Sequence, residues 1–224
     1  AHAWRKRPYT VANFVASVDG RASFAGRSGP LGDDGDKALF TALRAQADAV
    51  LVGTNTLATE RYGRLIPDPE VRARRRSAGR RPEPILCTAT RSGKLPLDIP
   101  VFAEPEAEIV VFTGAKVSLG PVAARVDVVR TEAGKLSFTT ALAELRAQRD
   151  IRALLCEGGP TVLGALVREQ ALDELFLTVT AKLAGGGAAP AITSGPALPE
   201  LAPAELAGVL ERAGTLFLRY RSQI

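Results

Sequence analysis

The chain has 224 residues, of which 46% are hydrophobic and 24% are charged, and its formal net charge at pH 7 is +5. These are the proportions of a globular protein, and the length is that of one domain with a complete hydrophobic core. No apolar run approaches the ~20 residues that a membrane-spanning helix requires, and no signal-peptide pattern opens the chain. We therefore expect a single domain over residues 1–224, cytoplasmic and without membrane contact, with a frayed N-terminus over residues 1–7.

The histidine and cysteine content restricts the chemistry further. The one histidine, His2, lies at the polar N-terminus, so a Ser-His-Asp triad, a Cys-His pair and a histidine-ligated zinc site each lack a key residue. The two cysteines, Cys87 and Cys156, each end an apolar strand-like run and are predicted to be buried free thiols rather than a disulfide. We expect no metal, so the chemistry must rest on carboxylates, hydroxyls, backbone groups or a cofactor.

The N-terminal part of the chain predicts a strand, a turn and a helix. Residues 10–16 are β-rich and mostly apolar, which is typical of a buried strand. A turn follows at residues 17–21. Asp33 or Asp34 can cap a helix that runs to about Ala47, because apolar residues recur there at helical spacing.

The remaining elements alternate between strands and helices. A strand over residues 48–52 ends at Gly53, and an apolar strand over residues 153–156 runs into a glycine turn and a helix. Further strands are predicted at residues 84–88, 109–112, 126–129, 173–181 and 215–220, and a further helix at about residues 139–149. This alternation predicts an α/β fold with a mainly parallel twisted sheet and helices on both faces. The two closing strands have no strong helix between them, so we expect an antiparallel C-terminal edge strand.

Six arginines are concentrated in one short segment: Arg72, Arg74, Arg75, Arg76, Arg80 and Arg81. Prolines bracket the segment, and neither a nucleic-acid recognition motif nor interleaved aromatic residues accompany it. We therefore interpret residues 72–81 as a solvated, mobile loop whose charge attracts phosphorylated ligands. Nucleic acid is not expected as a partner.

The most informative segment is the strand-to-helix junction Glu-Gly-Gly-Pro-Thr at residues 157–161. Gly158 and Gly159 have no Cβ, so the backbone can turn tightly and approach a ligand, and Pro160 suits the first position of a helix. The free N–H groups of that helix would form an anion site, typical for phosphate or pyrophosphate; the alternative is an ordinary turn. The segment is not a P-loop, because Ala165 stands where the lysine belongs, and the first strand is not followed by G-x-G-x-x-G.

Four polar or glycine-rich loops follow the carboxyl ends of predicted strands, at residues 13–20, 53–56, 88–92 and 157–161. In open α/β sheets, ligands bind outside these ends of the strands. The convergence of the four loops on one edge of the sheet favours a nucleotide-binding site.

A set of motifs occurs in a fixed order across about residues 8–221: Ser17-Val18-Asp19-Gly20-Arg21, Leu43-Arg44-Ala45, Ala47-Asp48-Ala49-Val50-Leu51-Val52-Gly53, Thr56, Glu157-Gly158-Gly159-Pro160-Thr161 and Leu172-Asp173-Glu174-Leu175. In this order and spacing they resemble the reductase domain of riboflavin biosynthesis, within the dihydrofolate-reductase-like fold. The resemblance implies NADPH-dependent hydride transfer to a heterocyclic substrate, with 5-amino-6-(5-phosphoribosylamino)uracil or a related pyrimidine as the leading candidate. It also implies a homodimer.

The resemblance further implies roles for individual residues. Those assigned to the cofactor are Gly53, Thr54, Thr56, Thr88, Arg91, Ser92, Glu157, Gly158, Gly159, Pro160 and Thr161. Among them the glycine turn would hold the pyrophosphate, and Arg91 would bind an adenosine 2′-phosphate unless it is only a solvated loop charge. Those assigned to the substrate are Asn13, Ser17, Glu60, Arg61 and Arg64, with one of the two arginines on the substrate's phosphate.

The chain departs from the family pattern in three places. Members that act on the ribosylamino-pyrimidine phosphate commonly carry lysine where this chain has Asn13, and an Asp-Asn-Pro run where it has residues 60–62. The zinc deaminase domain that is often fused ahead of the reductase has no counterpart, since neither H-x-E nor P-C-x-x-C occurs. We therefore expect a stand-alone reductase.

Two aspartates are the candidate catalytic residues. Asp36 lies where the dihydrofolate reductase fold places its pterin-binding acid, and typical pyrimidine reductases have a small residue there. Its carboxylate could pair with a 2-amino-pyrimidine edge or help to deliver a proton; alternatively it is a first-turn residue that the helix dipole favours by ~0.3–1 kcal/mol. Asp19 belongs to the Ser-Val-Asp-Gly-Arg motif but is also typical of a turn. Glu157 could bond either loop amides or a ligand.

Three functions stay open from the sequence. The leading one is the NADPH-dependent pyrimidine reductase. The second is a dihydrofolate-reductase-like pterin reductase that uses Asp36, and the third is a nucleotide-binding protein without catalysis.

Overall fold

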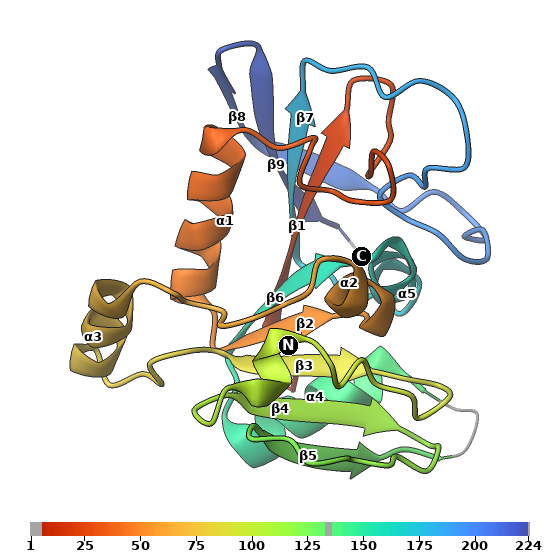
Figure 1. The fold of residues 1–224 in the computed structure, drawn as a ribbon. Helices are drawn as coiled ribbons and strands as arrows, with labels where there is room; N and C mark the ends of the chain where they lie inside the picture. Colours follow the sequence, from red (N-terminus) through yellow and green to blue (C-terminus); the bar gives the residue numbers. More distant parts are fainter. Residues whose placement is uncertain (1–5, 133–135, 224) are drawn as a thin grey trace.

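The computed structural model describes residues 6–132 and 136–223. Within these ranges, nine strands form one sheet in the order β5-β4-β3-β2-β6-β1-β7-β9-β8 (Figure 1). The strands are β1 (Tyr9–Ser17), β2 (Ala49–Val52), β3 (Ile85–Ala89), β4 (Glu108–Thr113), β5 (Arg125–Arg130), β6 (Ala153–Gly158), β7 (Glu174–Thr180), β8 (Ala204–Arg212) and β9 (Thr215–Ser222). All pairs from β5 across to β7 are parallel. The predicted α/β fold with a mainly parallel sheet is confirmed.

The antiparallel edge contains two strands rather than one. β9 pairs antiparallel with β7, and β8 pairs antiparallel with β9. The sequence analysis located β9 but missed β8, because its residues, Ala-Glu-Leu-Ala-Gly-Val-Leu-Glu-Arg, combine good helix formers with a glycine. Pairing with β9 places this segment in the sheet, since tertiary context outweighs a weak local preference.

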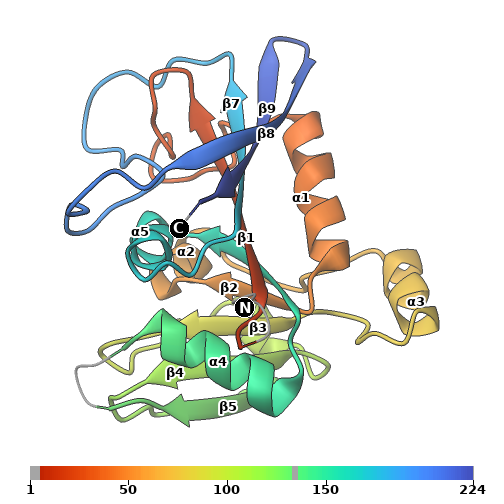
Figure 2. The same ribbon diagram turned by 180° about the vertical axis from the view of Figure 1, so that it is seen from behind.

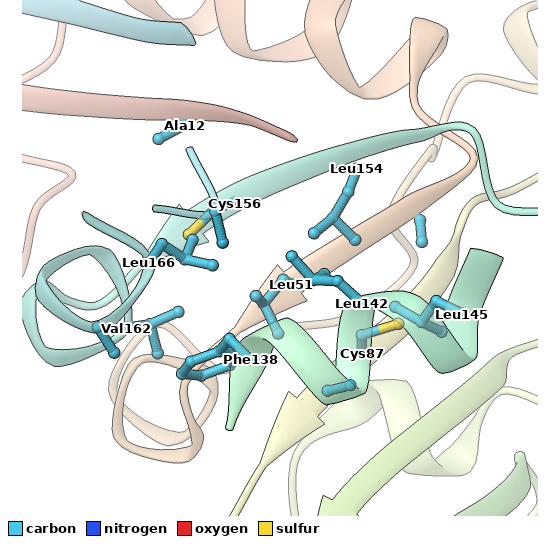
Figure 3. Packing of buried hydrophobic residues seen from close by; sticks show 14 of the residues in the cluster. Ala12, Leu51, Cys87, Phe138, Leu142, Leu145, Leu154, Cys156, Val162 and Leu166 are labelled. Atoms are coloured by element: carbon cyan, nitrogen blue, oxygen red, sulfur yellow. The ribbon is translucent and has the colours of Figure 1, made fainter. Parts of the chain in front are cut away.

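Helices cover both faces of the sheet, as predicted. On one face, α4 (Phe138–Arg149) and α5 (Pro160–Arg168) pack their apolar side chains onto Leu51, Leu154 and their neighbours (Figures 2 and 3). On the other face lie α1 (Asp34–Gln46), α2 (Thr54–Thr59) and the short 3-10 helix η2 (Pro100–Ala103). Leu57 of α2 and Phe102 of η2 are enclosed in the core of that face.

Both cysteines lie in the first of these cores as free thiols, as predicted. Cys87 comes from β3 and Cys156 from β6 (Figure 3). Burial raises the pKa of each thiol to about 12. Both thiols are therefore protonated at neutral pH and unreactive as nucleophiles.

Most of the arginine-rich segment is helical, so the prediction of a loop is wrong there, whereas Arg74, Arg76, Arg80 and Arg81 are exposed, as a solvated segment requires. The side chain of Asp68 caps the start of α3 (Pro69–Ser77). Arg75 is only 4% exposed, and its guanidinium donates to the carbonyls of Ala45 at 2.7 Å and Ala47 at 2.9 Å. These carbonyls end α1, so Arg75 satisfies backbone acceptors that a helix C-terminus leaves free.

The prediction of a frayed N-terminus is wrong at Arg7. This side chain is buried and forms two hydrogen bonds to the Asp173 carboxylate, at 2.6 and 3.0 Å. Residues 1–5, including His2, lie outside the described residues. None of the helices in the described ranges has both the length and the apolar character that crossing a bilayer requires.

Candidate functional site

Two adjoining cavities open around the start of α5. The larger has a volume of about 570 Å³ and is walled by β1, the loop of residues 22–32, α1 and residues 55–63. The smaller has a volume of about 240 Å³ and lies between residues 53–56, Arg91 and the first turn of α5. Both cavities share one wall, which consists of Asn55, Thr56, Gly159 and Pro160.

The predicted glycine turn forms that shared wall. The Gly53 N–H donates to the Gly158 carbonyl at 2.6 Å, and α5 begins directly after Gly159. A Cβ on Gly159 would lie 2.7 Å from the Thr56 hydroxyl, and a Cβ on Gly158, whose φ is +101°, would lie 3.0 Å from the Phe14 ring. The Gly158–Gly159 peptide is cis. Glycine is required here, and the wall therefore presents bare backbone beside the N-terminus of α5, as an anion site needs.

Most residues predicted to hold a cofactor line the smaller cavity: Gly53, Thr54, Thr56, Arg91, Gly159, Pro160 and Thr161. Gly158 precedes this wall at the end of β6. Thr88 does not contribute, because it is 0% exposed within β3. Ser92 lies beyond the strand with its hydroxyl 3.4 Å from that of Thr90, and it lines neither of the two cavities.

Glu157 stands at the wall of the larger cavity, at the centre of a buried network. Its side chain is 1% exposed. The carboxylate accepts hydrogen bonds from Arg44 Nε at 2.6 Å, from Arg44 Nη2 at 2.7 Å and from the Tyr62 hydroxyl at 2.8 Å. The Arg44 guanidinium also stacks over Phe40, 4.1 Å from the ring centroid. This network joins α1, β6 and the segment after α2 into one rigid wall.

The charges of this network stabilise one another. Burial disfavours the charged form of Arg44, but the Glu157 carboxylate outweighs that effect, so the pKa of Arg44 lies above its ordinary value. Burial and the charge of Glu157 together raise the pKa of Tyr62 well above its ordinary value. The tyrosine therefore stays a neutral hydrogen-bond donor.

The sequence analysis assigned no role to Arg44 or to Tyr62. Arg44 was quoted only within a family motif, and Tyr62 only within a segment that departs from the family. The sequence does indicate the contact between Phe40 and Arg44, because these residues are four positions apart on the predicted helix and share one face. Nothing local linked that face to Glu157, which lies 113 residues away.

Asn13 and Asp36 both line the larger cavity, from β1 and from the first turn of α1. Asp33 caps α1 and accepts a hydrogen bond from the Asp36 N–H at 2.8 Å. Burial raises the pKa of the Asp36 carboxyl, and Thr178 and Lys182 act in the opposite direction without cancelling the rise. Asp36 is therefore both a first-turn residue and part of the cavity wall.

Ser17 and Asp19 lie outside both cavities. Asp19 accepts hydrogen bonds from the Ser17 hydroxyl and from the N–H groups of Ala184 at 3.1 Å and Gly185 at 2.9 Å. These bonds, led by the one from Ser17, lower the pKa of the Asp19 carboxyl. The structure places the predicted catalytic Asp19 at a junction between two loops.

Glu60 and Arg61 line the larger cavity, whereas Arg64 does not. Glu60 accepts hydrogen bonds from the N–H and the hydroxyl of Ser28, at 2.8 and 2.9 Å, and so ties the loop of residues 22–32 to the cavity rim. Arg61 is exposed and lies 3.5 Å from Asp98. The Arg64 guanidinium is bound by three carboxylates, at 2.8, 2.7 and 2.9 Å, from Glu83, Glu104 and Glu106.

Comparisons with known proteins agree with this fold and site. The family model of the RibD C-terminal domain matches residues 8–213. The 2,5-diamino-6-ribosylamino-4(3H)-pyrimidinone 5′-phosphate reductase of Archaeoglobus fulgidus is 27% identical over 194 residues, which cover 84% of this chain and 87% of that protein. A pyrimidine reductase-like protein from Corynebacterium diphtheriae superposes with a TM-score of 0.83 at 25% identity, covering 97% of this chain and 92% of that one.

The likeness extends to a more distant fold relative. Dihydrofolate reductase from Enterococcus faecalis superposes with a TM-score of 0.54 at 13% identity, over 96% of each chain. This likeness concerns the fold alone, and it confirms the dihydrofolate-reductase-like architecture expected from the sequence. Because the family model covers nearly the whole sheet and both cavities, the chain belongs to the RibD C-terminal domain family.

Proposed function

We propose that this chain is an NADPH-dependent oxidoreductase that reduces a phosphorylated ribosylaminopyrimidine in riboflavin biosynthesis. Its family membership supports this function, since relatives that match most of its length are named as reductases of such a pyrimidine. The observation that carries the proposal is the pair of adjoining cavities. Because they share the wall at Thr56, Gly159 and Pro160, a cofactor and a substrate can be held side by side.

The smaller cavity is the proposed cofactor site. A side chain at position 159 is excluded, because a Cβ there would come within 2.7 Å of the Thr56 hydroxyl. The backbone at Gly53 and Gly159 therefore stays bare, so a pyrophosphate can approach it. Thr54, Thr56 and Thr161 offer hydroxyl donors in the same wall. When bound, the nicotinamide cofactor supplies the hydride, and the protein supplies orientation and electrostatics.

The choice of NADPH over NADH is supported by Arg91, which lines the smaller cavity. An exposed guanidinium forms paired hydrogen bonds with a phosphate, so it suits the extra phosphate of NADPH. Ser92 follows it and stays a candidate partner, whereas the enclosed side chain of Thr88 does not. The E. faecalis dihydrofolate reductase is described in complex with NADP(H).

The larger cavity is the proposed substrate site. Asn13 and Asp36 face the heterocycle, and Arg61, which is exposed at the cavity rim, binds the substrate's phosphate. Glu60 closes the site indirectly, because its carboxylate holds the loop of residues 22–32 through Ser28. Arg64 has no place in this proposal, since three carboxylates already surround it.

Turnover of defined substrates tests this proposal. Purified protein is mixed with NADPH and, in parallel, with the ribosylaminopyrimidine phosphate and with dihydrofolate, and oxidation of NADPH is followed by absorbance. We expect turnover of the pyrimidine alone. Turnover of dihydrofolate alone would make the chain a pterin reductase, a candidate that the position of Asp36 in the cavity wall favours. NADPH binding without any turnover of the pyrimidine would refute the proposed function.

We also propose a cytoplasmic homodimer that forms through the edge strand β8. Leu206, Val209 and Leu210 on this strand are 51%, 50% and 73% exposed. An edge strand that carries exposed apolar side chains is a template for pairing with another chain. Light scattering after size-exclusion chromatography checks this state, and a monomer at micromolar concentration would contradict it.

A further inference from the structure

Lys182 extends from a backbone that the sheet holds in place. Strand β7 ends at Thr180, which pairs with Ser17 of β1. Beyond the strand, the Lys182 N–H donates to the Thr180 carbonyl at 2.7 Å, and the Lys182 carbonyl accepts from the Val18 N–H at 3.0 Å. The starting point of this side chain is therefore fixed relative to β1, which forms one wall of the larger cavity.

The ammonium of Lys182 reaches three consecutive carbonyls of the loop that follows β1, which lies next to the segment after β7 (Figures 1 and 2). It donates to Pro30, Leu31 and Gly32 at 2.9, 2.8 and 3.2 Å. An ammonium has three N–H groups and no acceptor, so these bonds match its whole donor capacity. Hydrogen bonds from a charged donor are also stronger than neutral ones. One side chain therefore holds the end of a loop that lies 150 residues earlier in the sequence.

This loop is a wall of the larger cavity, and it has little apolar burial of its own. Ser28, Gly29 and Gly32 line the cavity. Within residues 18–32, all of which the structure describes, Leu31 alone is buried. The place of the loop therefore depends on hydrogen bonds from other segments, because a segment with few buried apolar contacts opens easily.

Other contacts fix the chain on both sides of the segment that the ammonium holds. On one side, the Glu60 carboxylate binds the N–H and the hydroxyl of Ser28. On the other side, the Thr215 hydroxyl donates to the Asp33 carboxylate at 2.7 Å. The residues between these two points receive their support from Lys182.

We propose that Lys182 is a positioning residue for the substrate, because its ammonium holds residues 30–32 and with them a wall of the larger cavity. Lys182 itself lines neither of the two cavities, so it acts through this wall. The backbone at Gly32 lies close to Asp36 of α1, since a Cβ there would be 2.6 Å from its carboxylate. A shift of the wall therefore alters the cavity on two sides. This inference rests on the proposed function, which assigns the larger cavity to the pyrimidine.

Lys182→Met tests the residue, because it removes the ammonium and keeps an unbranched side chain. We expect kcat/KM for the ribosylaminopyrimidine phosphate to fall by about tenfold or more, since a misplacement of about 1 Å caused far from the reacting atoms can cost about 100-fold. The Kd of NADPH should stay within about twofold of the wild-type value, because residues 30–32 line no part of the smaller cavity. An equal loss for substrate and cofactor would overturn the inference.

Lys116→Met is the matched control for charge. Lys116 is exposed beyond β4 and lines neither of the two cavities. The control removes the same charge, and a loss of positive charge can by itself slow the capture of a phosphorylated substrate. This variant should keep the wild-type kcat/KM. If both variants lose kcat/KM equally, net charge is the cause and the inference is overturned.

Lys182→Ala allows a chemical rescue that a role in stability alone does not predict. Propylammonium has the three carbons and the ammonium that this substitution removes, and Lys182 is exposed, so the added cation can reach the carbonyls. We expect propylammonium to restore part of the lost kcat/KM, and sodium chloride at the same concentration to restore none. An equal response to the two salts would overturn the inference, as would a variant that loses Tm and keeps its kcat/KM.

Failure of this inference can be told apart from failure of the proposed function. If the wild type and Lys182→Met reduce the pyrimidine equally well, the function stands and the role of Lys182 is refuted. If the wild type does not reduce the pyrimidine, the function is refuted, and hydrogen–deuterium exchange over residues 23–32 still tests Lys182. Faster exchange there in Lys182→Met than in Lys116→Met supports its hold on the wall, and equal exchange refutes it. Circular dichroism verifies that each variant is folded.

Discussion

Replacing Glu157 by glutamine removes one charge from the buried network while keeping the side-chain volume. The Glu157 carboxylate is 1% exposed, and its partner Arg44 is 13% exposed. The substitution leaves the Arg44 guanidinium largely out of water without its counter-ion. Removing one partner of a buried ion pair costs about 3–5 kcal/mol. Because the glutamine oxygen still accepts one hydrogen bond, we expect the free energy of unfolding to fall by about 3 kcal/mol.

Thermal denaturation measures this loss. For a chain of this size, each kcal/mol lowers Tm by about 2–4 °C, so Glu157→Gln should lower Tm by about 6–12 °C. Asp98→Asn is the control, because it breaks an ion pair with Arg61 that is 3.5 Å long and whose side chains are 79% and 61% exposed. Such exposed pairs contribute about 0–1 kcal/mol. A Tm loss in Glu157→Gln no larger than that in Asp98→Asn would refute the reasoning.

Three further predictions concern stability and cofactor choice. Asp36→Asn should raise the free energy of unfolding by about 1 kcal/mol at neutral pH. The folded state raises the pKa of the Asp36 carboxyl above 3.8, so the wild type loses stability as the pH rises through that higher pKa. The stability advantage of Asp36→Asn should therefore vanish below pH 3.8, and urea denaturation at a series of pH values measures it. Gly164→Ala should lower the free energy of unfolding by about 1–3 kcal/mol, because its Cβ would lie 2.2 Å from the Ser194 carbonyl oxygen. Gly29→Ala is the control and should change Tm little, because its Cβ would have no atom within 4 Å. Arg91→Ala should weaken NADPH binding by about tenfold and leave NADH binding unchanged; an equal loss for both cofactors would contradict a contact with the 2′-phosphate.

Much of the fold could be predicted because its signals are local. The strand at β1, the helix capped by Asp33 and the glycine turn before α5 each carry their cause within a few residues. The predicted strands alternate with helices, and this alternation was enough to indicate a parallel sheet. β8 was missed for the opposite reason: its residues favour a helix by themselves, and pairing with β9 decides its structure. α3 was missed although its signals are local, since Asp68 caps it, Pro69 opens it and alanine and arginine are good helix formers.

The residues of the candidate site likewise divide into those that the sequence identifies and those that only the tertiary structure identifies. The glycine turn was predicted from the local sequence, because phosphate binding needs bare backbone and that need is visible in the sequence. Its hydroxyl neighbours were expected only from the resemblance to the reductase family. Arg64 looked as suitable for a substrate phosphate as Arg61 did. Only the structure reveals that three distant carboxylates surround Arg64 while Arg61 faces the cavity.

The sequence by itself determined the class of the fold, most of its strands and the glycine turn before α5. Tertiary structure decided which polar side chains are paired with one another and which line a cavity. Arg44 meets Glu157 across 113 residues, while Asn13 and Asp36, 23 positions apart in sequence, line one cavity. Hydrogen bonds and burial depend on distances in space, and no local pattern of residues specifies those distances until the sheet has brought its strands together.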